Sequence, residues 1–274
     1  MFEVRKSQSG FSRTIGFLEL LYHSTVRAVR KSGGRNVILG LLGSMMQSLT
    51  FVLAFFFMFE VLGMRAAALR GDFLLYIMSG IFVFMTHTQT LSAVMGSEGP
   101  TSPMMQHAPM NTMIAVISAA FASLYTQLLS MCVIIFGYHV IFTPVTIYQP
   151  LPAVGMVLIA WFSGIAVGMV FLAAKPWSPG GVQLASTIYQ RVNMFASGKM
   201  FVANTMPGFM LAMFDWNPLF HIIDQGRGFL FINYLPKHSS PTYPLIVAAA
   251  LLMIGLIGEN YTRKAASASW GSRA

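Results

Sequence analysis

Long runs of apolar residues without charge dominate this chain. The longest is the stretch 99–174, between Glu98 and Lys175, which contains no Asp, Glu, Lys or Arg. A soluble domain needs charged side chains on its solvated faces, whereas a charge at the centre of a membrane-spanning helix costs about 2.5–3.5 kcal/mol on insertion scales. The pattern therefore predicts one integral membrane domain that covers residues 1–274.

Charge-free windows of sufficient length predict the helices that cross the membrane. A hydrocarbon core of about 30 Å requires about 20 helical residues. Charged residues separate most of these windows, and Pro144, Pro150 and Pro152 divide the longest one. We expect an all-α, polytopic fold with spans at 37–59, 73–95, 113–142, 151–174 and 243–259.

The segment 187–237 leaves the number of spans open. It is apolar, but it contains Pro207 and Pro218 and the charged residues Arg191, Lys199, Asp215, Asp224 and Arg227. If 188–206 crosses the membrane, there are six spans and both termini are cytoplasmic; if it does not, there are five and the C-terminus is outside. The excess of Lys and Arg before the first span places the N-terminus in the cytoplasm in both cases, so this rule does not decide.

An amphipathic helix is expected ahead of the first span, at 11–33. Apolar residues recur there at steps of three and four, while Arg13, Arg27 and Arg30 fall largely on other faces, and Gly33 and Gly34 end the pattern. Such a helix lies along the membrane interface. It either sets the topology and binds anionic lipid, or serves as a docking helix for a cytoplasmic partner.

No motif for enzymatic chemistry is present. The nearest approach to a nucleotide-binding loop, Asn193–Met200, has Asn at the first Gly position and Met after Gly198-Lys199. His87 and His139 each stand without a nearby carboxylate, and we interpret both as buried hydrogen-bonding groups rather than metal or haem ligands. We therefore predict a protein that is not an enzyme and holds no cofactor or metal.

The charge distribution also bears on how such a protein would be driven. Charged residues make up 9% of the chain, the net charge is +9, and the first four expected spans contain no Asp, Glu, Lys or Arg. A transporter driven by protons or sodium would place such groups within the membrane. If the protein moves a solute, the energy is expected to come from a separate ATPase subunit.

Two further features predict contacts. The loop 97–111 contains three prolines and the pair Met104-Met105, which either packs into a partner's groove or forms an ordinary stiff turn. In the fourth span, Ala160, Gly164 and Gly168 place small residues on one helix face. Such a face allows close approach of another helix, either from the same chain or from a second copy.

The segment Ser197–Tyr234 resembles the C-terminal half of type 2 ABC transporter permeases, above all the polysaccharide export family that handles capsule and O-antigen. In that family a Ser-Gly-x-x-Phe-like stretch, a Pro, an Asn-Pro-Leu and a following Arg mark a re-entrant helical hairpin on the external side. The likeness covers nearly the whole chain, and the matching positions here are Ser197, Gly198, Phe201, Pro207, Asn217, Pro218, Leu219 and Arg227.

The resemblance implies the membrane subunit of an ATP-driven exporter in the bacterial inner membrane, with six spans and a re-entrant hairpin at 207–235. It implies a homodimer that forms the path for a lipid-linked polysaccharide, with no nucleic acid partner. A cytoplasmic ATPase dimer would dock on Arg13, Arg27, Arg30, Met104 and Met105, although the loop after the second span carries no Lys or Arg. The implied path and hairpin residues are Phe201, Pro207, Trp216, Asn217, Pro218 and Arg227.

Two alternatives to this function remain. Within the same family, the exported solute could be a small lipid or a drug, because no residue identifies the substrate. In a different class, the protein would be a non-transporting assembly or accessory subunit of a larger membrane complex.

In the hairpin, Asp224 and Arg227 are three residues apart and could pair on one helix face or lie on the solvent side.

Overall fold

The computed structural model describes residues 10–32, 37–61, 63, 73–99 and 112–271. Every regular element within these ranges is a helix, which confirms the all-α fold class for the described part of the chain. The elements are α1 (Gly10–Ser32), α2 (Val37–Val61), α3 (Phe73–Met95), α5 (Thr112–Ile141), α6 (Pro150–Ala174), α7 (Pro179–Ala196), a 3₁₀ turn (Ala203–Thr205), α8 (Gly208–Phe214), α9 (Pro218–Leu230) and α10 (Thr242–Gly271).

Five of these helices, α2, α3, α5, α6 and α10, are each long and apolar enough to cross a membrane. They match the expected spans 37–59, 73–95, 113–142, 151–174 and 243–259 closely, except that α10 continues to Gly271. The extension has a partner, because the hydroxyl of Thr262 donates to the carbonyl of Ala173 at 3.0 Å and accepts from the indole of Trp177 at 3.1 Å. The part of α10 around Thr262 therefore packs along the end of α6.

The expected helix at 188–206 is wrong in its bounds. Helix α7 begins nine residues earlier, with Pro179 in its first turn, and it ends at Ala196. The chain then leaves the helix because Gly198 adopts a φ of +69°, a conformation that glycine tolerates and other residues rarely adopt. A Cβ at this position would lie 2.5 Å from the ring of Phe220. Helix α7, with 18 residues, is not among the five long apolar helices.

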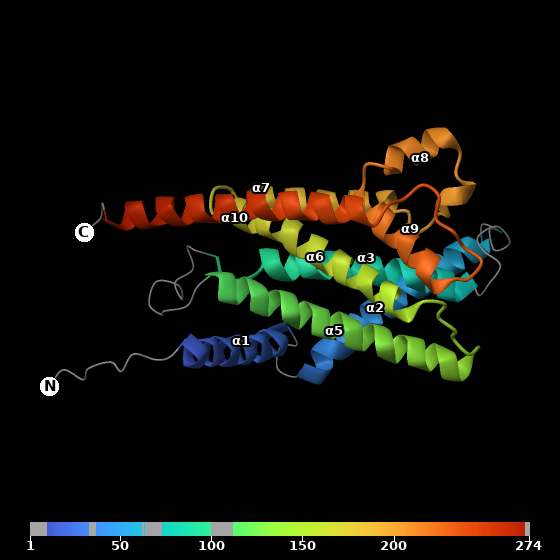
Figure 1. The fold of residues 1–274 in the computed structure, drawn as a ribbon, viewed down its shortest axis with the longest axis horizontal. Helices are drawn as coiled ribbons and strands as arrows, with labels where there is room; N and C mark the ends of the chain where they lie inside the picture. Colours follow the sequence, from blue (N-terminus) through green and yellow to red (C-terminus); the bar gives the residue numbers. More distant parts are fainter. Residues whose placement is uncertain (1–9, 33–36, 62, 64–72, 100–111, 272–274) are drawn as a thin grey trace.

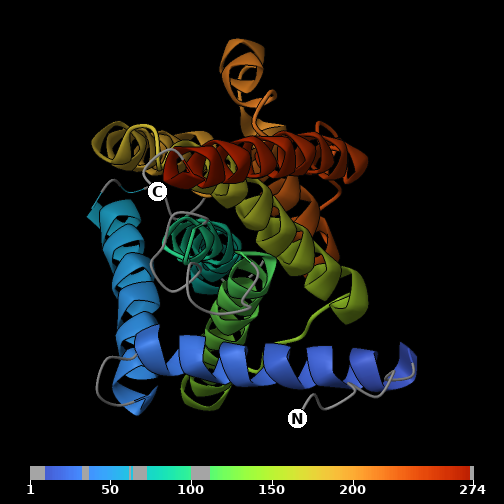
Figure 2. The ribbon, with the colours of Figure 1, turned by 90° about the vertical axis from the view of Figure 1, so that its left-hand side faces the viewer.

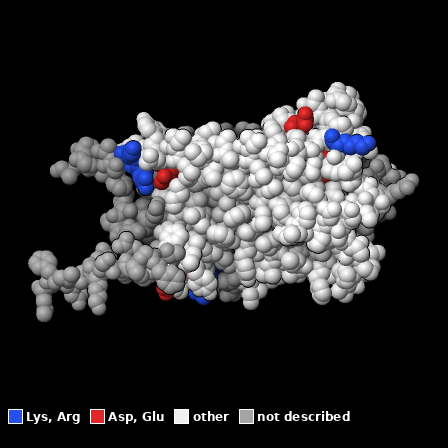
Figure 3. Space-filling view, viewed as in Figure 1, with Lys and Arg blue, Asp and Glu red and all other residues white. Residues whose placement is uncertain are grey.

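The helices form an elongated bundle with two distinct ends (Figure 1). Helices α2, α3, α5, α6, α7 and α10 run between these ends in alternating directions, while α8 and α9 lie at one end. Helix α1 runs across the bundle at the opposite end, where α10 also finishes (Figure 2). On the face drawn in Figure 3, Lys, Arg, Asp and Glu lie toward the two ends and leave a wide uncharged zone between them. This zone matches the apolar interior of a membrane.

Helix α3 forms the centre of the bundle. It contacts α2, α5, α6 and α9, and its residues from Tyr76 to Thr88 are buried without interruption. Helix α6 packs against α3 and also against α10. Helices α2 and α5 instead leave many of their apolar side chains exposed on the outside of the bundle.

The small residues of α6 explain how closely it approaches α3. A Cβ added at Gly164 would lie 2.6 Å from the carbonyl oxygen of His87, and one at Gly168 would lie 2.8 Å from the Cβ of Val94. Ala160 is fully buried on the same face. The expected small-residue face is therefore confirmed, and its partner is a helix of the same chain.

Candidate functional site

Asn217 joins the start of α9 to the end of α7. Its side-chain oxygen accepts a hydrogen bond from the backbone N–H of Leu219 at 3.0 Å, and Pro218 occupies the first helical position, where no N–H is needed. Its side-chain nitrogen donates to Asn193 Oδ1 and to the carbonyl of Ala196, both at 2.9 Å. One buried amide thus caps one helix and satisfies a carbonyl at the end of the other.

Arg227 holds the non-helical segment that follows α7. Its guanidinium donates to the carbonyl oxygens of Gly198 at 3.0 Å, Lys199 at 2.6 Å and Phe201 at 2.6 Å. The side chain is only 1% exposed. Backbone carbonyls outside a helix need such partners where water is excluded, so Arg227 makes the break after α7 tolerable. We call the set Asn193, Asn217, Arg227 and the carbonyls that they bind the hairpin joint.

Asp224 fixes the segment that returns from α9 to α10. Its carboxylate accepts hydrogen bonds from the hydroxyl of Tyr234 and from the hydroxyl of Ser239, the latter at 2.6 Å. Burial and the nearby Asp224 carboxylate raise the pKa of Tyr234, so the phenol stays protonated and remains a donor. Asp224 and Arg227 therefore bind different groups instead of pairing, and both are buried rather than on the solvent side.

The remaining expected path residues surround α8, which projects from the end of the bundle (Figures 1 and 2). Pro207 is exposed and precedes the helix, and the side chain of Trp216 is 62% exposed just after it. The ring of Phe201 stacks on that of Phe214, with centroids 6.3 Å apart. The structure thus divides the expected set: Asn217, Pro218 and Arg227 build the joint and Phe201 contributes its carbonyl to it, whereas Pro207 and Trp216 are exposed beside α8.

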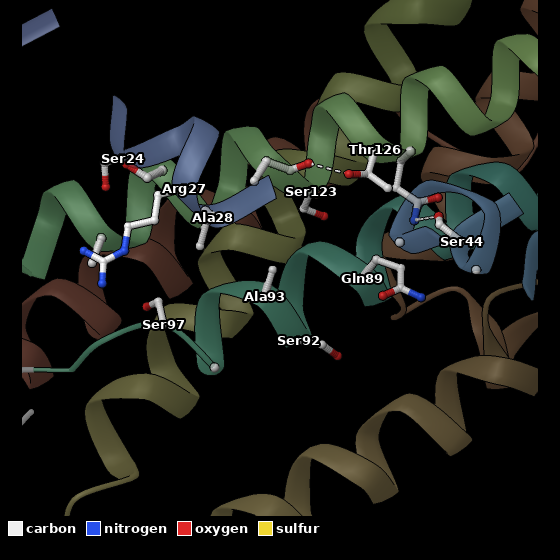
Figure 4. A pocket seen from close by; sticks show the side chains of 18 of the residues that line it. Ser24, Arg27, Ala28, Ser44, Gln89, Ser92, Ala93, Ser97, Ser123 and Thr126 are labelled. Atoms are coloured by element: carbon white, nitrogen blue, oxygen red, sulfur yellow. Dashed lines mark hydrogen bonds between the residues drawn. The ribbon is translucent and has the colours of Figure 1, made fainter. Parts of the chain in front are cut away.

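A polar cavity of about 800 Å³ lies between α1, α2, α3 and α5 (Figure 4). Amides, hydroxyls and small side chains line most of it, and Arg27 and Glu98 are the charged residues among its lining. It extends from the end of α3 near Ser97 to Gln89, which corresponds to about 12 Å along a helix. The uncharged polar residues that line this cavity are Ser24, Ser44, Gln47, Gln89, Ser92, Ser97, Ser118, Ser123, Thr126 and Gln127.

Hydrogen bonds between helices hold the wall of this polar cavity. Gln89 donates to Gln47 at 2.7 Å, which links α3 to α2. Gln127 donates to Ser44 at 3.3 Å, which links α5 to α2. Each amide has a second donor and further acceptor capacity, so the wall offers both kinds of hydrogen-bonding group without a net charge. Such a surface suits a neutral ligand that is rich in hydroxyl groups.

Sequence reasoning missed this cavity, although a signal was present. Uncharged polar residues recur at helical spacing within the apolar spans: Ser44 and Gln47 in α2, and Gln89 and Ser92 in α3. In α5 the same pattern appears as Ser123, Thr126, Gln127 and Ser130. Residues three or four apart share one helix face, so each span has a polar stripe. The sequence could not show that the three stripes face one another.

The expected docking residues are placed only in part. Arg27 and Arg30 are both exposed on α1, and Arg27 lines the polar cavity. Arg13 lies in α1, but its side chain is outside the described residues, as are Met104 and Met105. The structure therefore places two of these five side chains: Arg27 lines the polar cavity, and Arg30, three residues further along α1, lines a second, apolar groove.

The two histidines differ. His87 is buried, and its ring nitrogens hydrogen-bond with the hydroxyls of Ser163 at 2.8 Å and Tyr189 at 3.1 Å, which links α3 to α6 and α7. This confirms its interpretation as a buried hydrogen-bonding group. His139 accepts a hydrogen bond from the backbone N–H of Val145 at 3.0 Å, but it is exposed, so the expectation that it is buried is wrong.

No family model matches the chain, and no curated protein matches it. The description of this protein as a membrane protein therefore rests on its sequence pattern and its structure. The described residues form a helical bundle whose long apolar helices suit a membrane, with a polar cavity among them and a hydrogen-bonded joint at one end.

Proposed function

We propose that this protein is the membrane-spanning subunit of an ATP-driven exporter for an uncharged, hydroxyl-rich solute, best matched by a lipid-linked polysaccharide. The polar cavity is the observation that carries this proposal. A membrane bundle gains nothing by placing amides and hydroxyls around a space of about 800 Å³ unless that space admits something polar. A neutral glycan presents donors and acceptors of the same kind, so it can replace water at this wall.

The proposal includes six spans, with α7 as the sixth. Helix α7 runs the opposite way to α10 between the two ends of the bundle, so α1 and the end of α10 lie on one side (Figure 1). Arg191 is exposed on α7, and the hairpin joint supplies partners where the helix stops. With a cytoplasmic N-terminus, both termini face the cytoplasm of a bacterial inner membrane and α8 faces outward.

A homodimer forms through α2 in this proposal. Exposed apolar residues follow one face of α2 at steps of three and four, a spacing typical of paired helices. They lie on a helix whose other side carries Ser44 and Gln47 into the polar cavity. Pairing through this face would place the cavities of two subunits beside a shared interface. The residues of the face are Leu42, Met46, Leu49, Leu53 and Phe57.

The energy for transport comes from a separate ATPase dimer. The expected spans before residue 175 contain no charged residue for ion coupling, and no nucleotide-binding loop is present in the sequence. Helix α1 crosses the cytoplasmic end of the bundle and contacts α2 and α5, two walls of the polar cavity. A motor that pushes on α1 would therefore act on the cavity itself.

The test combines deletion, affinity purification and obstruction of the cavity. The tagged protein is purified from its native host to identify partners, and surface polysaccharide is measured in a deletion strain. The strain is complemented with Ala93→Trp, which projects an indole into the polar cavity, or with Ala249→Trp, which places the same group on the exposed side of α10. We expect a copurified ATPase and loss of surface polysaccharide with Ala93→Trp but not with Ala249→Trp.

The other outcomes separate the alternatives. A copurified ATPase with intact surface polysaccharide in the deletion strain would indicate export of a small lipid or a drug. Intact polysaccharide without any ATPase, together with loss of another membrane complex, would indicate an accessory subunit and would overturn the exporter proposal. Equal effects of the two Trp variants on surface polysaccharide would contradict the proposal that the polar cavity forms part of the transport path.

A further inference from the structure

An apolar groove of about 640 Å³ lies between α1 and α5, on the other side of α1 from the polar cavity. Its volume falls within the range of roughly 300–1,000 Å³ typical of small-molecule sites. Leu18, Tyr22, Val26 and Val29 form one wall at steps of three and four along α1. This groove shares no lining residue with the polar cavity or with the hairpin joint.

Helix α1 separates two environments of opposite polarity. Ser24, Arg27 and Ala28 face the polar cavity, whereas the apolar stripe that runs from Leu18 to Val29 faces the groove. Thr25 also lines the groove, but its hydroxyl donates to the carbonyl of Leu21 at 2.8 Å. The groove therefore meets the methyl side of Thr25 and suits a hydrocarbon ligand rather than a polar one.

The opposite wall of the groove is held in place by α6. Phe121 of α5 lines the groove, and its ring lies 5.4 Å from that of Trp161, centroid to centroid. The indole of Trp161 donates to the carbonyl of Ala120 at 2.8 Å. These contacts fix the aromatic wall independently of any ligand, so the groove is preformed.

The mouth of the groove has the chemistry of a membrane interface. Arg30 is the charged residue among its lining, and its side chain is exposed. Tyr22 and Tyr125 are also exposed there, and phenol rings favour the headgroup level, where one end is apolar and the other is wet. The apolar part of the groove suits an acyl chain, and the guanidinium of Arg30 at its mouth suits a phosphate, so the groove matches a phospholipid.

We propose that the groove between α1 and α5 binds one anionic phospholipid from the leaflet in which α1 lies. An acyl chain lies along Leu18, Val26 and Phe121, and the phosphate binds Arg30. The net charge of +9 favours an anionic headgroup. The proposal assigns Arg30 to lipid rather than to ATPase docking, and it does not depend on the exporter function. The lipid would stabilise α1 against α5, at the wall of the polar cavity.

The test measures quenching of Trp161 fluorescence by brominated lipids. Trp177→Phe, Trp216→Phe and Trp270→Phe leave Trp161 as the single tryptophan. The full-length protein is reconstituted into bilayers that contain brominated phosphatidylglycerol or brominated phosphatidylcholine. We expect phosphatidylglycerol to bind about fivefold more strongly, the equivalent of about 1 kcal/mol for one basic residue at an anionic surface.

Three variants locate the binding. Arg30→Gln is expected to remove the preference for phosphatidylglycerol, whereas Arg27→Gln, a matched loss of charge at a residue that lines the polar cavity instead of the groove, is expected to keep it. Val26→Phe fills the groove and is expected to lower quenching by both lipids. Because Arg30 is exposed, its substitution leaves the fold intact, which circular dichroism and gel filtration verify.

Several results would overturn the site. Equal quenching by the two lipids in the starting protein would rule out recognition of the headgroup. Equal losses with Arg27→Gln and Arg30→Gln would indicate diffuse attraction to α1 instead of a site. Weak quenching that rises when the protein is dissociated into monomers would indicate that a second copy covers the groove.

Discussion

The guanidinium carbon of Arg227 lies 4.1 Å from the centroid of the Tyr76 ring. This contact joins α9 to α3, the most deeply buried helix of the bundle. The same guanidinium donates to three backbone carbonyls after α7, and it passes close to Gly80, where an added Cβ would lie 2.9 Å from Arg227 Nη2. One side chain thus connects three parts of the chain that are distant in sequence.

Arg227→Gln is expected to destabilise the protein strongly. The substitution removes the charge-assisted hydrogen bonds to Gly198, Lys199 and Phe201 and leaves their carbonyls without a partner, so we expect a loss of about 3 kcal/mol in the free energy of unfolding. Arg227→Lys is expected to recover only part of this loss, because an ammonium lacks the planar fork. Unfolding in detergent, followed by circular dichroism, measures both.

The matched control for this prediction is Arg191→Gln. Arg191 is exposed on α7, so its loss is expected to change the free energy of unfolding by less than about 0.5 kcal/mol. If Arg227→Gln were as harmless as Arg191→Gln, the hairpin joint would not contribute to stability.

Asn217→Ala is expected to loosen the junction of α7 and α9. It removes the cap of α9 and the two bonds to Asn193 and Ala196, and we expect a loss of about 2 kcal/mol. A double-mutant cycle with Asn193→Ala isolates the bond between the two amides. Strict additivity of the two losses would contradict direct coupling, because residues in contact are expected to show a coupling energy.

Gly164→Ala tests the close packing of α6 on α3. The new Cβ would lie 2.6 Å from the carbonyl oxygen of His87, so the helices must separate, at a cost of about 2 kcal/mol. Gly155→Ala in the same helix is the matched control, because nothing lies within 4 Å of its Cβ position. That variant is expected to gain about 0.5–1 kcal/mol from helix propensity. Opposite signs in the unfolding measurements support the packing, and equal signs contradict it.

Lys199→Met is expected to stabilise the protein. The Lys199 ammonium is 3% exposed, lies 3.4 Å from the centroid of the Phe84 ring and has no hydrogen-bond partner among the described residues. A cation over an aromatic ring gains about 2 kcal/mol, whereas burying the charge costs several kcal/mol. The apolar methionine is therefore expected to raise the free energy of unfolding by about 1–2 kcal/mol.

Lys175→Met provides the contrast for this prediction. Lys175 donates to the carbonyl of Met95 at 3.2 Å, and its replacement is expected to cost about 1 kcal/mol. A large loss of stability with Lys199→Met would show that the buried cation has a favourable partner, and the prediction would then be wrong.

The long apolar helices could be predicted well from the sequence because their physical cause is local. A run without charge is long enough for the membrane or it is not, and prolines and charges mark its ends. The windows 37–59 and 73–95 match α2 and α3 within about two residues at each boundary. The periodicity of 11–33 likewise predicted α1. The break at Gly198 was harder to find, because its signal is a single conformation that Phe220 and Arg227 stabilise from elsewhere.

The sequence did not predict which faces of the spans turn inward. Among the five long apolar helices, α3 is the least apolar and the most buried, whereas α2 is more apolar and largely exposed. In water the more apolar helix would be the buried one, but lipid is as apolar as a protein core, so hydrophobicity does not sort these faces. Hydrogen bonds and close packing sort them instead.

The order of residues was enough to predict a membrane protein, the bounds of most of its long apolar helices, and the amphipathic character of α1. The folded chain was needed to show that Gln47, Gln89 and Gln127 meet around one cavity, and that Arg227 binds carbonyls up to 29 residues away. The difference lies in the sequence distance over which each interaction acts. Helix formation and membrane insertion depend on contiguous residues, whereas a cavity or a buried joint depends on partners that the chain brings together only when the helices pack.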